Sequence, residues 1–282
     1  MTNIISSVKV VYMGIKERRT KILLALILLS DVNLDFVTFD EKLQRVFDLS
    51  FNQKTRGTIS TLLKEKFIEK RTDNNHSTTT NSDQNLMLQE PSDKSLTFGN
   101  RYRLTDSGFN ELTLKFPFFR FLREKWDSKW RILSYEIPEK KREVRDRLRR
   151  EVSGWGLGPW HRSFWLTPHP IINNLRELVF QKEEEKYIQA FEAEYLVGSR
   201  DILIEKVWRK STLDKKYRDI FKIWHEVLSK DGEKLDKFIK IITTYVEILK
   251  IDPGLPIELV GNNWIGFEAF NVFKEIRSIL FS

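Results

Sequence analysis

Residues 50–71 read SFNQKTRGTISTLLKEKFIEKR, and this stretch decides the fold of the N-terminal part of the chain. Ser50-Phe51-Asn52-Gln53 has the S-x-x-Q form of a capping box, whose side chains satisfy unpaired backbone groups where a helix begins. The following apolar residues recur at i, i+3 and i+4, the spacing of one helical face: Ile59, Leu62 and Leu63. The stretch therefore predicts a helix that runs to about Lys66 and a strand over 67–71.

The flanking segments extend this reading. Arg18 to Ser30 is a run of helix formers that is apolar all round, which predicts a buried helix. Thr38-Phe39-Asp40-Glu41 resembles another capping box and predicts a short second helix through Phe47. Residues 72–94 are almost wholly polar and predict a loop, and 96–104 predict a second strand. Three helices followed by a two-stranded hairpin is the layout of a winged helix-turn-helix, whose third helix enters the major groove of DNA.

Basic residues gather on this predicted recognition helix and on the strands after it. The net charge of this segment is +4, because two acidic residues, Glu65 and Glu69, stand against six cations: Lys54, Arg56, Lys64, Lys66, Lys70 and Arg71. The returning strand adds Arg101 and Arg103, whereas the loop has no Lys or Arg from Thr72 to Asp93. A solvated helix end could account for some of these cations. We predict DNA contacts from six residues: Lys54, Arg56, Lys64, Lys66, Arg101 and Arg103.

The composition bounds the class of protein. The chain has 282 residues, a net charge of +8, 40% apolar residues and no cysteine. The absence of cysteine removes disulfide and thiolate chemistry and suits a reducing, cytoplasmic setting. The longest apolar run near the N-terminus, Ile22 to Leu29, is shorter than the roughly 20 residues of a membrane-spanning helix. Residues 1–182 hold all of the excess positive charge, so a polyanionic partner is expected there.

A second pattern begins at Trp130. Trp130 to Glu136 predicts an apolar strand, Glu139 to Glu151 a basic helix, and Arg162 to Thr167 another strand. A helix at Ile171–Gln181 and a strand at Ala190–Val197 complete a β-α-β-α-β order, which suggests a small ferredoxin-like unit. Three further helices are expected near the C-terminus: Lys215–Leu228, Glu233–Ile251 and Phe267–Leu280.

We therefore expect an α+β protein of three domains. They are a winged helix-turn-helix over 1–115, a ferredoxin-like domain over 125–200 and a helical C-terminal domain over 201–282. Trp155, Trp160 and Trp165 cluster around a turn and a strand, where they could form core or line a pocket. Trp264, after the Pro-Gly-Leu-Pro loop, is expected to hold the last helix in place.

Four segments of the chain resemble the PaaX family of bacterial repressors. They are Thr55 to Leu63 in the recognition helix, Tyr102-Arg103-Leu104-Thr105 at the wing exit, Trp130 to Glu139, and the segment Asp252 to Leu259 with Asn263 to Gly266. Three positions depart from the family pattern. Thr61 stands where the family usually has arginine, Lys66 where it has glycine, and Gly261 where it has proline.

The resemblance implies a homodimer that binds double-stranded operator DNA and that an acyl-CoA type of effector releases. It also implies a central domain similar in fold to the small nuclease-like subunit of CRISPR adaptation complexes. In those proteins a carboxylate that ends the first strand can bind a metal, and Glu136 occupies that position here. A metal-dependent nuclease is therefore the alternative function.

Catalytic chemistry finds little support in the residues themselves. The four histidines have no metal-ligand spacing, and Glu139 is the only carboxylate close to Glu136 in sequence. No phosphate-binding glycine loop or nucleophile motif is present. The basic helix at 140–150 could bind phosphate or an anionic effector, but its interleaved acidic residues favour a solvated, ion-paired face. We expect no enzyme, cofactor or metal site, and predict a sequence-specific transcriptional regulator.

Overall fold

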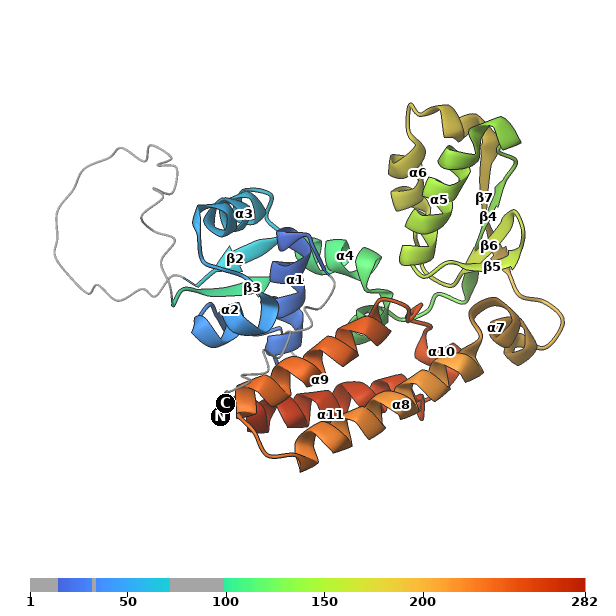
Figure 1. Ribbon diagram of the computed structural model, residues 1–282. Helices are drawn as coiled ribbons and strands as arrows, with labels where there is room; N and C mark the ends of the chain where they lie inside the picture. The colour runs from blue at the N-terminus through green and yellow to red at the C-terminus, as the bar shows by residue number, and fades with distance from the viewer. Residues whose placement is uncertain (1–14, 32–33, 72–98, 282) are drawn as a thin grey trace, which may run out of the picture. The chain divides into compact units, whose positions relative to one another are not determined.

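The computed structural model describes residues 15–31, 34–71 and 99–281 (Figure 1). These residues fall into two compact units, one within 14–111 and the other within 112–282. Both units combine helices with a small antiparallel sheet, which confirms the α+β class. The expected loop at 72–94 and the start of the expected strand at 96–104 lie outside the described residues.

The first unit is built from three helices and a three-stranded antiparallel sheet of order β1-β3-β2. The three helices are α1 (Arg18–Leu29), α2 (Glu41–Phe47) and α3 (Gln53–Lys64). A further helix, α4 (Asp106–Lys115), lies at the end of the unit. Its strands are β1 (Val37–Thr38), β2 (Ile68–Lys70) and β3 (Arg101–Leu104). Every residue from Ile22 to Leu28 is buried, which confirms that the all-round apolar helix lies in the core.

Both predicted capping boxes are wrong in the residue that caps. Asp40 caps α2, where its carboxylate accepts the Leu43 N–H, because Thr38 is paired in β1 opposite Arg101. Asn52 caps α3 and accepts the Thr55 N–H at 3.1 Å. Ser50 instead offers its carbonyl oxygen, which accepts the Thr55 hydroxyl at 2.6 Å. Asx and hydroxyl side chains cap equally well, so the sequence spacing alone did not separate them.

The second unit begins with the 3-10 helix η2 (Pro117–Leu122) and then a four-stranded antiparallel sheet of order β5-β6-β4-β7. Helices α5 (Arg142–Gly154) and α6 (Ile172–Val179) lie side by side on one face of this sheet (Figure 1). The strands are β4 (Lys129–Tyr135), β5 (Gly158–His161), β6 (Phe164–Thr167) and β7 (Ile188–Glu194). The β-α-β-β-α-β order is that of a ferredoxin-like fold.

The sheet therefore has one strand more than the three that the sequence predicts. The missed strand, β5, contains Pro159 and exposes most of its residues at the sheet edge, so it has neither the alternation nor the length of a typical strand. Leu133 and Tyr135 of β4 pack with Leu148 and Val152 of α5, which places the core between sheet and helices. Trp165 is in this core, Trp155 packs on its margin and Trp160 is exposed.

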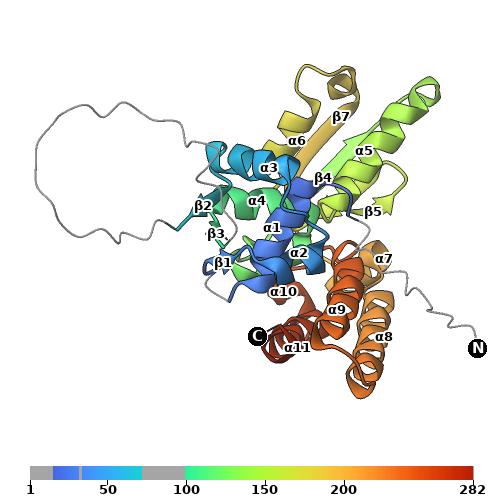
Figure 2. The same ribbon diagram turned by 60° about the vertical axis from the view of Figure 1, so that its left-hand side comes forward.

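The C-terminal part is helical. Helices α8 (Lys210–Ser229), α9 (Lys234–Leu249) and α11 (Ile265–Leu280) pack against one another as a three-helix bundle, best seen in Figure 2. Two helices that precede and interrupt the bundle were missed, α7 (Arg200–Trp208) and α10 (Ile257–Val260). No helix among the described residues combines the length and the apolar character needed to cross a membrane. The division into three domains stays a prediction.

Candidate nucleic-acid interface

Helix α3 presents a face that is basic and carries no carboxylate. Lys54, Arg56 and Lys64 are exposed on it, whereas Thr55, Ile59 and Leu62 are buried and fix its orientation in the unit. Within the described residues, none of the three exposed cations lies within ion-pair distance of an acidic side chain. Their charge therefore remains available to an external anion.

The two acidic residues that follow α3 are neutralised from elsewhere in the unit. Arg19 of α1 donates to the Glu65 carboxylate at 2.5 Å, and Arg103 forms an ion pair with Glu69 across the β2–β3 ladder. An acidic group that is already paired repels an approaching phosphate less than a free one. These pairs leave a positive field at the surface around α3.

Arg56 is held where the helix begins. Its guanidinium lies over the Phe51 ring, 5.4 Å from the ring centroid, and its backbone N–H donates to the Asn52 carbonyl at 3.0 Å. Stacking on an aromatic ring limits the side chain without using its N–H donors. Arg56 is thus an exposed, partly ordered set of N–H donors on α3, the helix that the sequence predicts to be the recognition helix.

The other predicted contact residues differ in how free they are. Lys66 is exposed and has a φ of 59°, a left-handed conformation that favours glycine. Arg101 is exposed and donates to the Phe36 carbonyl at 3.3 Å. Arg103 is stacked over Phe36 as well as paired with Glu69, so it is the most engaged of the six. The structure gathers Lys54, Arg56 and Lys64 on one helix but places Arg101 and Arg103 on the sheet.

Two residues of this surface were missed by sequence reasoning. Arg19 neutralises Glu65 from 46 positions away, and Phe51 supports the Arg56 guanidinium. No spacing signal connects Arg19 to Glu65, because a long-range ion pair leaves no periodic trace in the sequence. Phe51 could have been noted as an aromatic residue five positions before the key arginine.

The positive charge of the basic helix α5 is largely neutralised by acidic side chains on and around the helix. Arg145 donates to Glu139 at 2.7 Å, Arg142 lies 3.5 Å from Asp146, and Arg147 pairs with Glu184. The Arg145 guanidinium also lowers the pKa of Glu139 by hydrogen bonding. Such pairing leaves little unbalanced charge for phosphate.

The first strand of the ferredoxin-like sheet ends in a lone carboxylate. Glu136 is exposed and its backbone N–H donates to the Tyr187 carbonyl at 2.9 Å, while Glu139 is tied to Arg145. Across the described ranges, no three His, Cys, Asp or Glu side chains gather in a way that could hold a metal ion. His161 and His225 are exposed, His169 is buried, and His76 lies outside the described residues. Nothing in this arrangement favours the nuclease alternative.

Two family models match the chain. The PaaX protein central Cas2-like domain matches residues 123–203, and the PaaX-like protein C-terminal domain matches residues 208–282, so together they cover more than half of the chain. The chain belongs to the PaaX family. In this PaaX protein the glycine that the family usually has at position 66 fits the left-handed backbone found there. Gly261 has a φ of 84°, which proline cannot adopt.

The chain is similar to the uncharacterized protein Rv0674 from Mycobacterium tuberculosis, with 14% identity and a TM-score of 0.45, covering 94% of this chain and 99% of that chain. No curated protein matches the sequence.

Proposed function

We propose that this PaaX protein is a cytoplasmic, sequence-specific DNA-binding regulator that acts as a repressor. The observation that carries the proposal is the exposed face of α3, which holds Lys54, Arg56 and Lys64 without an acidic partner among the described residues. Membership of a family whose members are generally regulatory supports the same conclusion. Phosphate contacts from these cations supply affinity, and Arg56 reads a base edge.

The proposal includes a homodimer and a small anionic effector such as an acyl-CoA. A dimer places two recognition helices about one turn of DNA apart, so its operator is an inverted repeat. Release by an anion requires only that the effector binds better to the DNA-free protein than to the complex. Both features come from the family resemblance.

Arg56→Ala is expected to lower the affinity for the specific operator by about 10- to 100-fold, the cost of losing one bidentate arginine–guanine contact. The change leaves the buried face of α3 intact, because Arg56 is exposed. The measurement is a mobility shift with the DNA upstream of the protein's own gene, in the presence of excess competitor. A salt series run on the same complex is expected to give a steep loss of affinity, with a slope of about −0.9 per phosphate contact.

Arg200→Ala is the matched control, because Arg200 is an exposed arginine outside the first unit. It is expected to bind the operator as the unmodified protein does. Equal operator affinity of Arg56→Ala and Arg200→Ala would show that α3 is not the reading helix. Weak binding that is the same on every DNA would overturn the proposed regulator as a whole.

A further inference from the structure

A small pocket lies in the second unit, where the ferredoxin-like sheet meets the C-terminal helices. Its volume is about 60 Å³, and its walls come from three segments: residues 120–127, which run from the second half of η2 towards β4, the loop 168–170 after β6, and the loop 254–256 before α10. A ligand in it would contact parts of the chain matched by both PaaX models. None of its lining residues is among the predicted DNA contacts.

The pocket contains a buried cation whose donors are mostly unused. The Arg120 side chain is 4% exposed, yet its only hydrogen bond to the described residues runs from Nη1 to the Trp155 carbonyl at 3.0 Å. A guanidinium carries five N–H donors, and a buried charge is costly unless it is paired. Burial lowers the pKa of Arg120 to about 10, so the group remains charged at neutral pH.

Glu124 only partly compensates this charge. Its Oε1 lies 3.9 Å from Arg120 Nε, beyond hydrogen-bond distance, and its side chain is one-third exposed. Desolvation raises the pKa of Glu124, with Arg120 opposing that effect. The carboxylate is therefore both a weak partner for the guanidinium and one that can move out towards solvent.

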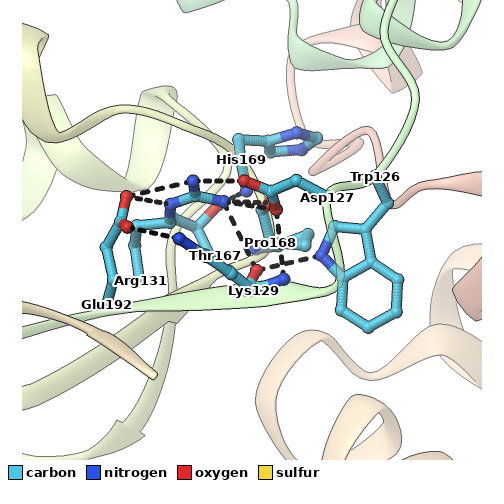
Figure 3. A network of polar contacts seen from close by, with 8 residues as sticks. All are labelled: Trp126, Asp127, Lys129, Arg131, Thr167, Pro168, His169 and Glu192. Atoms are coloured by element: carbon cyan, nitrogen blue, oxygen red, sulfur yellow. Dashed lines mark hydrogen bonds and ion pairs between the residues drawn. The ribbon is translucent and has the colours of Figure 1, made fainter. Parts of the chain in front are cut away.

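The second acidic residue of the pocket is already occupied. Figure 3 shows both carboxylate oxygens of Asp127 turned to the Arg131 guanidinium, at 2.8 Å and 2.5 Å. Arg131 also pairs with Glu192, which in turn lies 3.4 Å from Lys129. This network is balanced in charge, with two cations and two anions. What remains at the pocket is Arg120 with Lys125 against Glu124 alone, an excess of one positive charge.

His169 closes the pocket without adding charge. It is buried, and its Nε2 lies 3.1 Å from the Pro253 carbonyl, to which it donates. Desolvation, followed by the nearby Arg120, holds the pKa of His169 well below its ordinary value, so the ring is neutral. The same bond joins the 168–170 loop to the loop that carries Gly254. The remaining walls are largely apolar, with Phe121 and Trp126 among prolines.

We propose that this pocket binds a compact carboxylate, which takes the unused donors of Arg120 and places a short hydrocarbon group against Trp126 and the prolines. Arginine and carboxylate form two parallel, charge-assisted hydrogen bonds, which no neutral ligand of the same shape can reproduce. The small volume admits a short acid or the carboxylate end of a longer one. That such a carboxylate changes DNA binding rests on the proposed function and is separate from its acyl-CoA type of effector, which carries a thioester in place of a free carboxylate; that it binds does not rest on that function.

The test is a calorimetric titration of the full-length protein, without DNA, with sodium propionate and with propionamide at constant ionic strength. Propionate is expected to bind and propionamide is not. Glu124→Gln removes the competing carboxylate and is expected to tighten propionate binding at least threefold, a gain that misfolding cannot produce. Arg120→Lys is expected to weaken it at least tenfold, with the melting temperature recorded alongside because Arg120 also bonds to Trp155.

Glu226→Gln is the control, since Glu226 is an exposed glutamate on α8 away from the pocket residues. Equal responses to propionate and propionamide, or the same affinity in Glu124→Gln and Glu226→Gln, would overturn the site. Repeating the mobility shift with saturating propionate tests the effector role, for which weaker operator binding is expected. A protein that binds no DNA would overturn the proposed function and leave the propionate titration to decide the pocket.

Discussion

Gly254→Ala is expected to destabilise the second unit by about 3 kcal/mol or more, because the new methyl group has no space and the backbone has a positive φ, which alanine rarely adopts. Gly254 has a φ of 65°, and a Cβ built on it would lie 2.1 Å from the Pro117 carbonyl oxygen and 2.3 Å from its carbonyl carbon. Both obstacles are backbone atoms, so no side-chain rotation can relieve them. Urea denaturation, monitored by tryptophan fluorescence, measures the change in the free energy of unfolding.

Gly154→Ala is the control in the same unit. Gly154 is the last residue of α5, and nothing lies within 4 Å of the position that its Cβ would take. Alanine there is expected to be neutral or to stabilise by about 0.5–1 kcal/mol, since it restricts the unfolded chain and suits a helix. If both variants unfolded at the urea concentration of the unmodified protein, the close approach of the 252–256 loop to η2 would be wrong.

Helices and strands with a clear local pattern of apolar residues could be predicted from the sequence. The apolar run of α1 and the strand β4 occur where expected, and α3, the predicted recognition helix, begins and ends within about two residues of its predicted bounds. The location of Lys54, Arg56 and Lys64 on a single helix could be predicted for the same reason, while their contact with DNA stays a prediction. What could not be seen is that Glu65 and Glu69 are neutralised by Arg19 and Arg103, which are 46 and 34 positions away.

Weakly patterned elements were missed for an equally physical reason. Helix α7 exposes Ile202 and buries Ile204 and Val207, so its apolar residues do not follow one clear stripe. The pocket shows more strongly that a feature without a local pattern cannot be predicted from the sequence. Arg120, His169 and Gly254 come from segments separated by tens of residues, and nothing in the local pattern of any one of them indicates a shared site. Only the packing of η2 and the two loops brings them together.

The most specific resemblance to the family lies in the segment Asp252 to Leu259, and the contacts of this segment give that resemblance a structural basis. Asp252 is buried, and its carboxylate accepts the Gly254 N–H at 2.8 Å and the Tyr217 hydroxyl at 2.6 Å. The first bond closes the turn at Gly254, and the second ties that turn to α8. Trp264 packs edge-on against Tyr217 at the start of α11, so one tyrosine links the turn and the last helix.

Asp252→Asn is expected to change how the stability of the second unit depends on pH. Burial raises the pKa of Asp252 to about 6, against the opposing effect of its two hydrogen bonds, whereas an unfolded aspartate titrates near pH 3.9. Below about pH 4 both states hold the proton. Between pH 4 and 6 the folded state keeps a proton that the unfolded state has lost, so stability contributed by the neutral carboxyl falls as pH rises and is gone above pH 6.

The asparagine variant lacks this loss, because its amide does not ionise and its oxygen can still accept the Gly254 N–H. The difference in unfolding free energy between the two proteins is therefore expected to shift by about 3 kcal/mol in favour of the variant between pH 4 and 7. Carboxylates with lowered pKa values, such as Asp127 and Glu192, act in the opposite direction but equally in both proteins, so they cancel in the difference.

Urea denaturation at a series of pH values provides the measurement, with Asp231→Asn as the control because Asp231 is exposed on the loop between α8 and α9. The control is expected to follow the unmodified protein at every pH. Parallel curves for Asp252→Asn and the unmodified protein would mean that Asp252 titrates as a solvated carboxyl and that water reaches the turn. A shift of the expected size and sign would place the carboxyl in the dry core beneath the pocket loop, where the turn that positions Gly254 depends on it.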